Sequence, residues 1–251
     1  IISNLNKVYS EIFNINNLIV SFTGDEEDLA LIKNSLPMVI DNLNKEKLIP
    51  KKYNFTQQKT NEGILSSANV QYVSKGYNFK KLGYKYNGSM RVLTTILNGD
   101  YLHNRIRAQG GAYGAGISID RTGHITTYSY RDPNLKESID VYDGMGEYIK
   151  NLNIDESELT NYIIGTISRL DPAMTPYDKG QLATSKYISN ITQEEIQKTR
   201  EEVLNTKLED IKAYGDLLDA AMKQDYLCVL GNENKIMENK NIFNKLVKLK
   251  K

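Results

Sequence analysis

The sequence predicts an α+β fold in which helices cover a largely antiparallel sheet. Strand-like runs are grouped with long amphipathic helices and do not alternate with them one for one. Residues 112–120 and 124–130 are strand candidates separated by three residues, which is short enough for an antiparallel hairpin. The chain has 251 residues, so it can hold one large domain or two small ones with a substantial core.

The N-terminal part is predicted to contain a helix, a strand and a second helix. Residues 4–13 place apolar side chains on one helical face. The run LIVSFT, residues 18–23, is rich in β-formers and is followed by a Gly-Asp pair, so we expect a strand. Residues 25–43 have the spacing of an amphipathic helix, which Pro37 should kink or split.

A polar segment follows, and after it another strand. Residues 44–63 are rich in lysine and glutamine around Pro50 and are interpreted as a linker. A run of charged residues is, however, more often the solvent-exposed face of a folded element. Residues 65–73 alternate between apolar and polar side chains, as expected for a half-buried strand.

The central part of the chain is predicted to change from helix to strand within a few residues. Residues 89–97 have helical spacing, and Gly99 is expected to interrupt this helix. A helix-like run from Tyr101 then places Arg107 at its end, before a double glycine stops it. A strand begins near Tyr113 and forms the first half of the hairpin.

Arg107 and Tyr113 are the candidate site residues. They lie six residues apart on either side of the double glycine, so one side chain leaves a helix end while the other starts a strand. The two can therefore aim at one point. Arginine is permanently protonated and offers a fork of N–H donors, and the tyrosine hydroxyl is a second donor on a rigid stem. Together they suit an oxygen that becomes negative during a reaction.

The same pattern also has a purely structural interpretation. An arginine in the last turn favours the negative end of the helix dipole, glycine commonly follows that end, and tyrosine is a common strand residue. A phosphate-binding loop is disfavoured, because the glycine spacing matches neither G-x-G-x-x-G nor G-x-x-x-x-G-K-[ST].

The region after the hairpin is predicted to be mostly helical. Asp132 is expected to cap a helix that runs to residue 149 and has Pro133 at its first position. Residues 156–170 repeat the helical spacing. The proline-containing loop 171–176 either shapes a binding site or simply connects two helices.

The last part is predicted to hold two capped helices, a strand and a terminal helix. Thr192 with Glu195, and Thr206 with Glu209, are capping boxes that each open a helix. Residues 226–230, YLCVL, form the final strand, and the tail is expected to be a helix with a basic last turn.

Composition excludes several classes of function. Lys and Arg total 32 against 31 Asp and Glu, so the chain has almost no net charge that would attract nucleic acid or an anionic membrane. No apolar run approaches the roughly 20 residues of a membrane span. The first residues also lack the basic segment followed by an apolar segment that is typical of a signal peptide. We therefore expect a soluble, cytoplasmic protein. Because the chain begins with Ile1 in what reads as the middle of a helix, we expect it to be a piece of a longer protein.

Cysteine and histidine are too sparse for a disulfide framework or a metal site. Cys228 is the one cysteine, expected to be a buried thiol in an apolar strand, and a single cysteine fits a reducing compartment. His103 and His124 are isolated, without a second histidine or cysteine at ligand spacing. We expect no metal or other cofactor in this chain.

The sequence resembles the pitrilysin-type zinc metallopeptidases, also called inverzincins, of the presequence protease and insulysin-like branch. The resemblance rests on R-x-x-G-G-A-Y-G at residues 107–114, RVLTTILNGDYLHNRI before it and TYSYRDPN after it. LIVSFTGD looks like the closing strand of a preceding repeat. The chain is most similar to the C-terminal part of such enzymes, with residues 1–55 closing a preceding repeat and forming a linker, and residues 56–251 forming the last α+β repeat.

The resemblance implies a metallopeptidase repeat of the LuxS/MPP-like type, in an enzyme whose two bowl-shaped halves close over a peptide. Zinc would be bound in the absent N-terminal half by an H-x-x-E-H helix and a distal glutamate, where a zinc-bound water attacks the peptide carbonyl. Arg107 and Tyr113 fall on the arginine and tyrosine that this family supplies from its C-terminal half. They are then implied to bind the substrate carbonyl and stabilise the tetrahedral intermediate.

The chain itself has no H-x-x-E-H motif. Residues 91–95, at the place of a zinc helix in an equivalent repeat, cannot hold a metal and are expected to pack in the core. We therefore expect this piece, with a peptide substrate and the N-terminal half as partners, to be the inactive substrate-binding part of a zinc metalloendopeptidase. The alternative is a non-catalytic peptide-binding or structural member of the same fold family. A nucleotide or nucleic-acid binder lacks both the phosphate loop and the basic excess.

Overall fold

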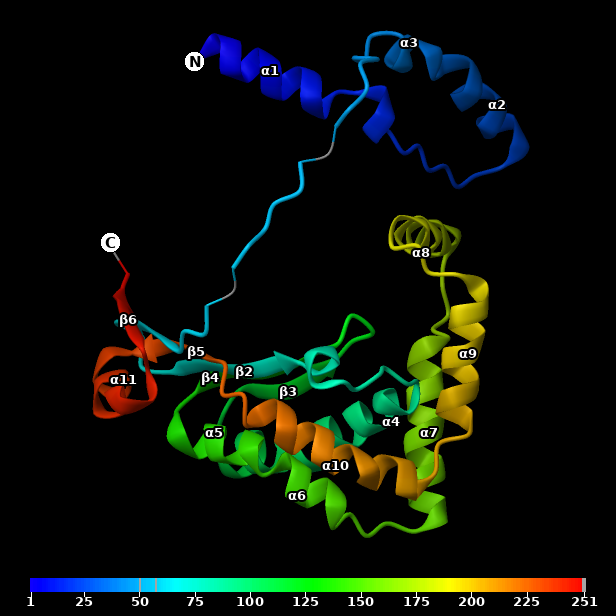
Figure 1. Cartoon of the computed structure of the whole chain (residues 1–251). Helices are drawn as coiled ribbons and strands as arrows, with labels where there is room; N and C mark the ends of the chain where they lie inside the picture. Colours follow the sequence, from blue (N-terminus) through cyan, green and yellow to red (C-terminus); the bar gives the residue numbers. More distant parts are fainter. Residues whose placement is uncertain (50, 57, 250–251) are drawn as a thin grey trace. The chain divides into compact units, whose positions relative to one another are not determined.

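The chain folds into two compact units. The computed structural model describes residues 1–49, 51–56 and 58–249. The first unit combines Ile1–Gln57 with Ala173–Thr192, and the second combines Gln58–Pro172 with Gln193–Lys251 (Figure 1). Pro50 and Gln57 of the expected linker lie outside the described residues. No helix in the described part of the chain has both the length and the apolar character needed to cross a bilayer.

The described residues of the first unit form helices but no strand. Asp25 caps helix α2 by accepting a hydrogen bond from the backbone N–H of Asp28 at 3.0 Å. Pro37 opens a new short helix, so the predicted split at this residue is confirmed. The helical segments are α1 (Ile2–Ile12), η1 (Ile15–Asn17), α2 (Glu26–Ser35), α3 (Pro37–Ile40) and α8 (Pro176–Ile188).

Two sequence-based expectations for this unit were wrong or incomplete. Residues 18–23 form no strand, because the neighbouring element is a helix and not the edge of a sheet. The hydroxyl group of Ser21 contacts the hydroxyl group of Thr184 in α8. Helix α8 was not predicted, although Thr175 and Asp178 form a capping box at its start. The loop 171–176 is the connection between α7 and α8, and its Asp171 pairs with Arg200.

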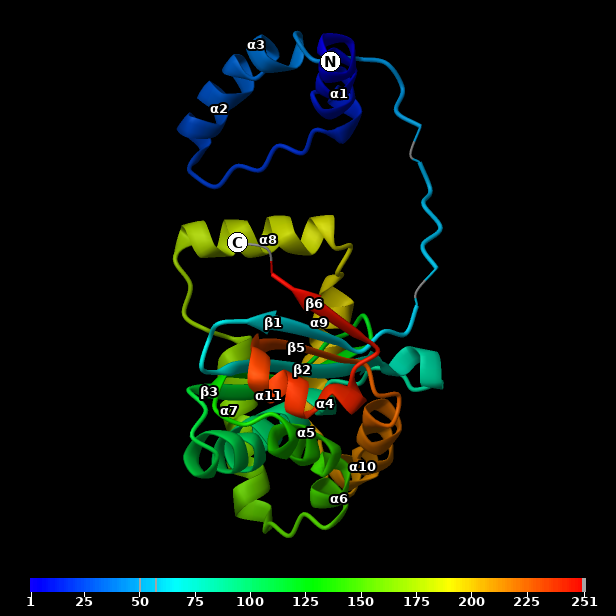
Figure 2. The same ribbon diagram turned by 90° about the vertical axis from the view of Figure 1, so that its left-hand side faces the viewer.

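The second unit contains a six-stranded mixed sheet in the order β3-β4-β2-β5-β1-β6 (Figure 2). The pairs β3·β4, β4·β2 and β2·β5 are antiparallel, whereas β5·β1 and β1·β6 are parallel. The predicted α+β class with a largely antiparallel sheet is therefore confirmed. The strands are β1 (Glu62–Ser66), β2 (Gln71–Asn78), β3 (Gly114–Ile119), β4 (His124–Asp132), β5 (Leu227–Asn232) and β6 (Lys245–Lys248).

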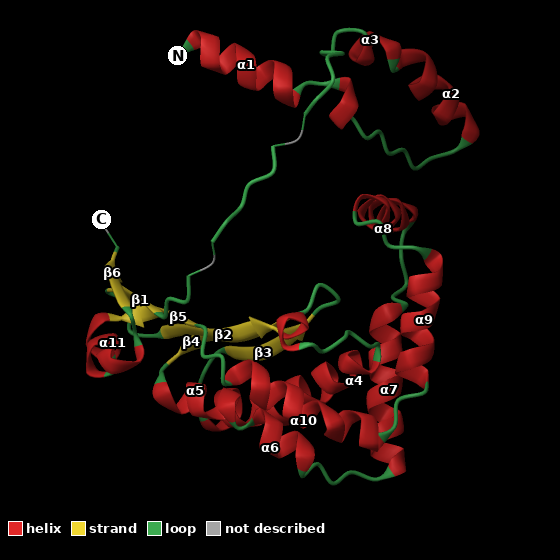
Figure 3. Cartoon of the chain, viewed as in Figure 1, coloured by secondary structure: helices red, strands yellow, loops and turns green. Residues whose placement is uncertain are grey.

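Helices cover one face of this sheet, where the core lies (Figure 3). The predicted hairpin and the predicted helix at 156–170 are both confirmed. The helical segments of this unit are η2 (Phe79–Leu82), α4 (Ser89–Ile96), η3 (Leu97–Gln109), α5 (Lys136–Asp143), α6 (Met145–Lys150), α7 (Glu156–Leu170), α9 (Gln193–Leu204), α10 (Leu208–Met222), α11 (Glu233–Glu238) and η4 (Lys240–Ile242).

Strand β4 shows how the core face is selected. Ile125, Thr127 and Ser129 are buried toward the helices, while the side chains between them are exposed on the other face. The same alternation in β5 buries Leu227 and Val229. Cys228 therefore points to the other face and is exposed, so the expectation of a buried thiol was wrong.

Three predicted elements of the second unit need correction. The single strand at 65–73 is instead two, because the chain bends after Ser66, whose hydroxyl accepts from the backbone N–H of Ala68 at 3.3 Å. The tail is not one helix: after α11 it forms β6, which pairs parallel to β1. Its last two residues, Lys250 and Lys251, lie outside the described residues.

At two of the predicted helix caps, the structure also differs from the prediction. Asp132 ends β4 and does not begin a helix; α5 starts at Lys136, and Asp132 accepts hydrogen bonds from Asn134 and Ser138 instead. The Thr206 hydroxyl bonds back to the carbonyl of Glu202, and α10 begins after Lys207. The helix that the Thr192 pattern predicts is present as α9.

The crossing of α6 and α10 requires two glycines. A Cβ placed on Gly146 would lie 2.7 Å from the carbonyl oxygen of Gly215, and one on Gly215 would lie 2.8 Å from the carbonyl oxygen of Gly146. Both contacts are with backbone atoms, which cannot rotate away. The two helices can therefore pack at this distance only while both positions lack a side chain.

We expect Gly146→Ala to destabilise the protein by about 1–3 kcal/mol, because overpacking outweighs the gain of about 1 kcal/mol in helix propensity. Urea unfolding measures the change. Gly165→Ala in α7 is the matched control, since no described atom outside the local backbone of α7 lies within 4 Å of the position that an added Cβ would take, and it should stabilise the protein slightly. Equal effects of the two substitutions would contradict the close crossing.

Candidate active-site surface

Arg107 lies near the end of a continuous helical segment. Helix α4 passes directly into η3, a wider helix of π type, so the interruption predicted at Gly99 does not occur. The helix continues through Gly99, and no described atom outside its local backbone lies within 4 Å of the place where a side chain would start. π-type turns are frequent at functional sites, because they change the direction in which side chains leave a helix.

The double glycine ends this segment as predicted. Gly110 is the C-cap, and Gly111 has a φ of +80°, a left-handed conformation that glycine adopts at little cost. The N–H of Gly111 bonds to the carbonyl of Arg107 at 3.0 Å, and that of Ala112 bonds to Ile106 at 3.1 Å. The chain thus reverses within two residues, and Tyr113 precedes the first residue of β3.

The amide of Asn98 joins the helix to the strand. Its Nδ2 donates to the carbonyl of Ile117 at 3.0 Å, and its Oδ1 accepts from the Ile117 N–H at 2.7 Å. Because β3 is an edge strand of the sheet, Ile117 has no strand partner on this side, and Asn98 satisfies both backbone groups. This pair sets the distance between η3 and β3.

Further hydrogen bonds hold the two ends of η3. Near the start of η3, the buried Tyr101 donates to the carbonyl of Val141 at 3.0 Å, and burial raises the pKa of Tyr101. At the other end, Nδ2 of Asn134 donates to the carbonyl of Gly110 at 2.6 Å. The segment that carries Arg107 is therefore fixed to its surroundings at both ends.

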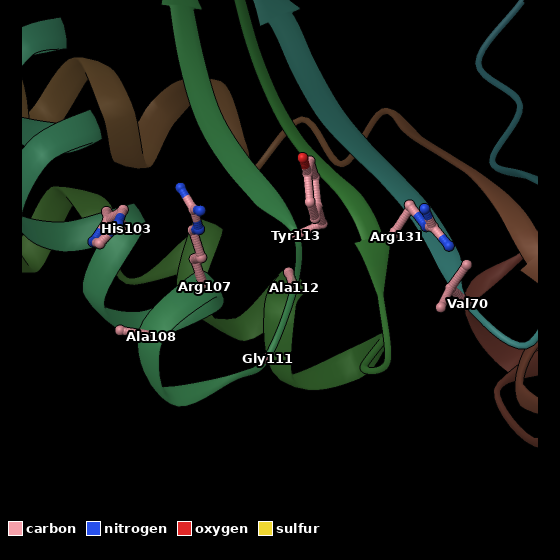
Figure 4. Close-up of a pocket in the computed structure, with 8 residues that line it drawn as sticks. All are labelled: Val70, His103, Arg107, Ala108, Gly111, Ala112, Tyr113 and Arg131. Atoms are coloured by element: carbon pink, nitrogen blue, oxygen red, sulfur yellow. The ribbon is translucent and has the colours of Figure 1, made fainter.

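Arg107 and Tyr113 line one cavity of about 560 Å³. Tyr113 is 68% exposed and Arg107 is also exposed, so neither is sealed in the core. Figure 4 shows the two side chains extending the same way from the helix and from the start of the strand. The described residues that line it are Val70, His103, Arg107, Ala108, Gly111, Ala112, Tyr113 and Arg131.

An aromatic row continues from Tyr113 across the sheet. The backbone N–H of Tyr113 donates to the carbonyl of Tyr130 at 3.1 Å, and the two rings lie 5.9 Å apart. The ring of Tyr130 in turn lies 5.3 Å from that of Tyr72, edge to face. These contacts restrict the Tyr113 ring without covering its hydroxyl.

The described residues do not suit zinc. Among them no group of three or more His, Cys, Asp and Glu side chains lies together at metal-binding range. His103 is in the cavity lining, but its neighbours there carry no further metal ligand. In α4, Val92 and Leu93 are fully buried in the core.

Arg131 is the residue of this surface that sequence reasoning missed. It lies in the stretch TYSYRDPN and has a φ of +50°, which costs a non-glycine residue about 1–2 kcal/mol. In the structure the alternating burial of β4 ends here, where two exposed residues, Tyr130 and Arg131, stand side by side.

The fold belongs to the pitrilysin type. The crystal structure of pitrilysin matches with a TM-score of 0.57 and 10% sequence identity, covering 80% of this chain and 22% of that chain. Residues 61–231 match the PreP C-terminal domain, and the chain belongs to this family. The resemblance inferred from the sequence is therefore confirmed.

Two curated relatives show how the chain compares in length. Protein HypA of Clostridium perfringens is 44% identical over 242 residues, which cover 96% of this chain and 25% of the relative. Presequence protease 1, chloroplastic/mitochondrial, of Arabidopsis thaliana is 32% identical over 225 residues, covering 86% of this chain and 20% of the relative. The chain thus spans a quarter or less of these relatives.

We expect Asn98→Asp to destabilise the protein by about 1–3 kcal/mol. The carboxylate keeps the acceptor for the Ile117 N–H but removes the donor and sets a charge against the Ile117 carbonyl. Chemical unfolding measures the change. Asn151→Asp is the control, at the exposed C-cap of α6, where the side chain donates to the carbonyl of Glu147 in the same helix. An equal, small effect at both positions would show that Asn98 does not join helix and strand.

Proposed function

We propose that this chain is the C-terminal, substrate-binding part of a zinc-dependent metalloendopeptidase, in which Arg107 and Tyr113 bind the carbonyl oxygen of the peptide bond being cleaved. The main support is that both residues line one cavity and that both are exposed. Membership of the PreP C-terminal domain family supports the same class of enzyme.

The chemistry of the two side chains fits this role. A peptide carbonyl gains negative charge on its oxygen when a nucleophile adds to it, and donors aimed at that oxygen lower the barrier. The guanidinium supplies charged N–H donors, and the phenol supplies a neutral donor from a different direction.

The remaining parts of the enzyme would come from the N-terminal half of the same polypeptide. That half would bind zinc, which supplies the activated water, and this piece alone would be inactive. In this proposal residues 1–55 close a preceding repeat and form a linker, and residues 56–251 are the last repeat.

We place the enzyme in the cytoplasm, since a single cysteine cannot form an internal disulfide. Cell fractionation tests this location.

The test is the pair of variants Arg107→Ala and Tyr113→Phe in the full-length protein, assayed on an unstructured peptide. Each should lower kcat about 10²-fold, equivalent to roughly 3 kcal/mol, because a donor that acts in the transition state is lost. The values of kcat and KM are measured separately. A loss confined to KM would mean uniform substrate binding and would contradict the catalytic role.

Two control variants test whether the effects are specific to the cavity. Arg105→Ala removes an exposed arginine from the same helix, whose guanidinium lies over the Tyr101 ring and outside the cavity lining. Tyr177→Phe removes a hydroxyl from a tyrosine that is 69% exposed, close to the 68% of Tyr113. Both should keep the activity of the unmodified protein. If the cavity variants also keep it, Arg107 and Tyr113 have no catalytic role; a full-length protein that cleaves no peptide would instead be a non-catalytic member of the fold family.

A further inference from the structure

Strand β4 contains a β-bulge directly beside the cavity. Gln71 of β2 pairs with Asp132, but Val73 pairs with Ser129, so that Tyr130 and Arg131 together oppose the single residue Tyr72. Such bulges insert one extra residue, and next to functional sites they redirect a side chain. Here the extra residue changes the direction of Arg131.

Without the bulge, Arg131 would face the core. The buried positions of β4 are Ile125, Thr127 and Ser129, and the next position in that series is residue 131. The bulge gives the buried position to Asp132, which is 0% exposed and accepts hydrogen bonds from Asn134 and Ser138. Arg131 is exposed as a result, in a left-handed conformation that glycine would adopt more cheaply.

Arg131 and Arg107 differ from the other arginines in having no partner among the described residues. Arg105 lies over a tyrosine ring. The remaining four bond to carboxylates or hydroxyls: Arg91 to Tyr86, Arg121 to Thr199 and Glu195, Arg169 to Thr95, and Arg200 to Asp171. Both of these arginines line the cavity, and no Asp or Glu is among the described residues of its lining.

We infer that Arg131 is a specificity-determining residue that binds a carboxylate of the peptide substrate. Figure 4 shows Arg107 and Arg131 on opposite sides of Tyr113. A peptide whose scissile carbonyl meets Arg107 and Tyr113 would therefore continue past Arg131. The inference rests on the proposed function, which it deepens by naming the chemistry of a second recognition point.

A carboxylate fits this position better than a neutral group. A guanidinium can bind both carboxylate oxygens through two parallel N–H donors, a geometry that also gives orientation. Among the described residues of the cavity lining there is no Asp or Glu that would compete for it. The carboxylate can be the C-terminus of the peptide or the side chain of Asp or Glu, and these two sources are separable by experiment.

The experiment compares peptides that differ by one charge, on the full-length protein. One pair has a free C-terminal carboxylate or a C-terminal amide, and further pairs have Glu or Gln at successive positions. Fluorescence anisotropy gives the Kd, and hydrolysis gives kcat and KM. We expect one carboxylate to strengthen binding and kcat/KM by roughly tenfold, through a charge-assisted hydrogen bond. The pair that shows the preference identifies its source.

Arg131→Gly should abolish this preference, so that the charged and the uncharged peptide of each pair bind with the same Kd. Glycine suits the backbone at a φ of +50°, so the variant is expected to fold at least as well as the unmodified protein. Arg131→Lys should restore part of the preference, because the charge returns without the fork of donors. Arg105→Ala should keep the whole preference.

The outcomes separate this inference from the proposed function. If Arg131→Gly keeps the full carboxylate preference, or if the unmodified protein has none, the role of Arg131 is wrong even where peptides are cleaved. If peptides bind without being cleaved, the proposed function fails, and the ratio of Kd values still decides the role of Arg131. A protein that binds no peptide in the anisotropy assay overturns both.

Discussion

The geometry of the cavity depends on the two hydrogen bonds between the Asn98 amide and the backbone of Ile117. Each contributes only about 0.5–1.5 kcal/mol to stability, but together they fix one helix against one strand edge. Asn98 lies in η3, which carries Arg107 at its other end, and Ile117 lies in the strand that follows Tyr113. A change in this spacing would move the two candidate donors relative to each other.

Two left-handed backbone positions complete the arrangement, and both lie in the cavity lining. Gly111 turns the chain from helix to strand, and Arg131 ends the exposed run of the neighbouring strand. Tyr113 and Tyr130 connect these two positions through a backbone hydrogen bond and a ring contact. Glycine adopts this conformation freely, whereas arginine does so at a cost that the bulge and the buried Asp132 impose.

Local patterns in the sequence predicted much of this fold. The helix at 156–170, the split at Pro37 and the hairpin after Tyr113 follow from spacing, proline and a short turn, each of which acts within a few residues. The wrong predictions concern segments whose secondary structure depends on residues far away in the sequence. Residues 18–23 have the composition of a strand but lie beside a helix, and the tail forms a strand because β1 offers it a parallel edge.

The candidate site was predictable only in part for the same reason. Arg107 and Tyr113 are close in sequence and share a recognisable motif, whereas Arg131 joins them through a bulge whose register depends on pairing with Gln71 and Val73. Periodicity alone places Arg131 on the buried face. No single-sequence pattern reveals an irregularity of register that two strands create together.

The most direct measurement is a crystal structure of the full-length protein with a bound phosphinate peptide, whose tetrahedral oxygen stands in for the oxygen of the cleavage intermediate. We expect a guanidinium nitrogen of Arg107 and the hydroxyl oxygen of Tyr113 to lie about 2.7–3.1 Å from that oxygen. A bound peptide whose phosphinate contacts neither side chain would contradict the proposed role of this surface.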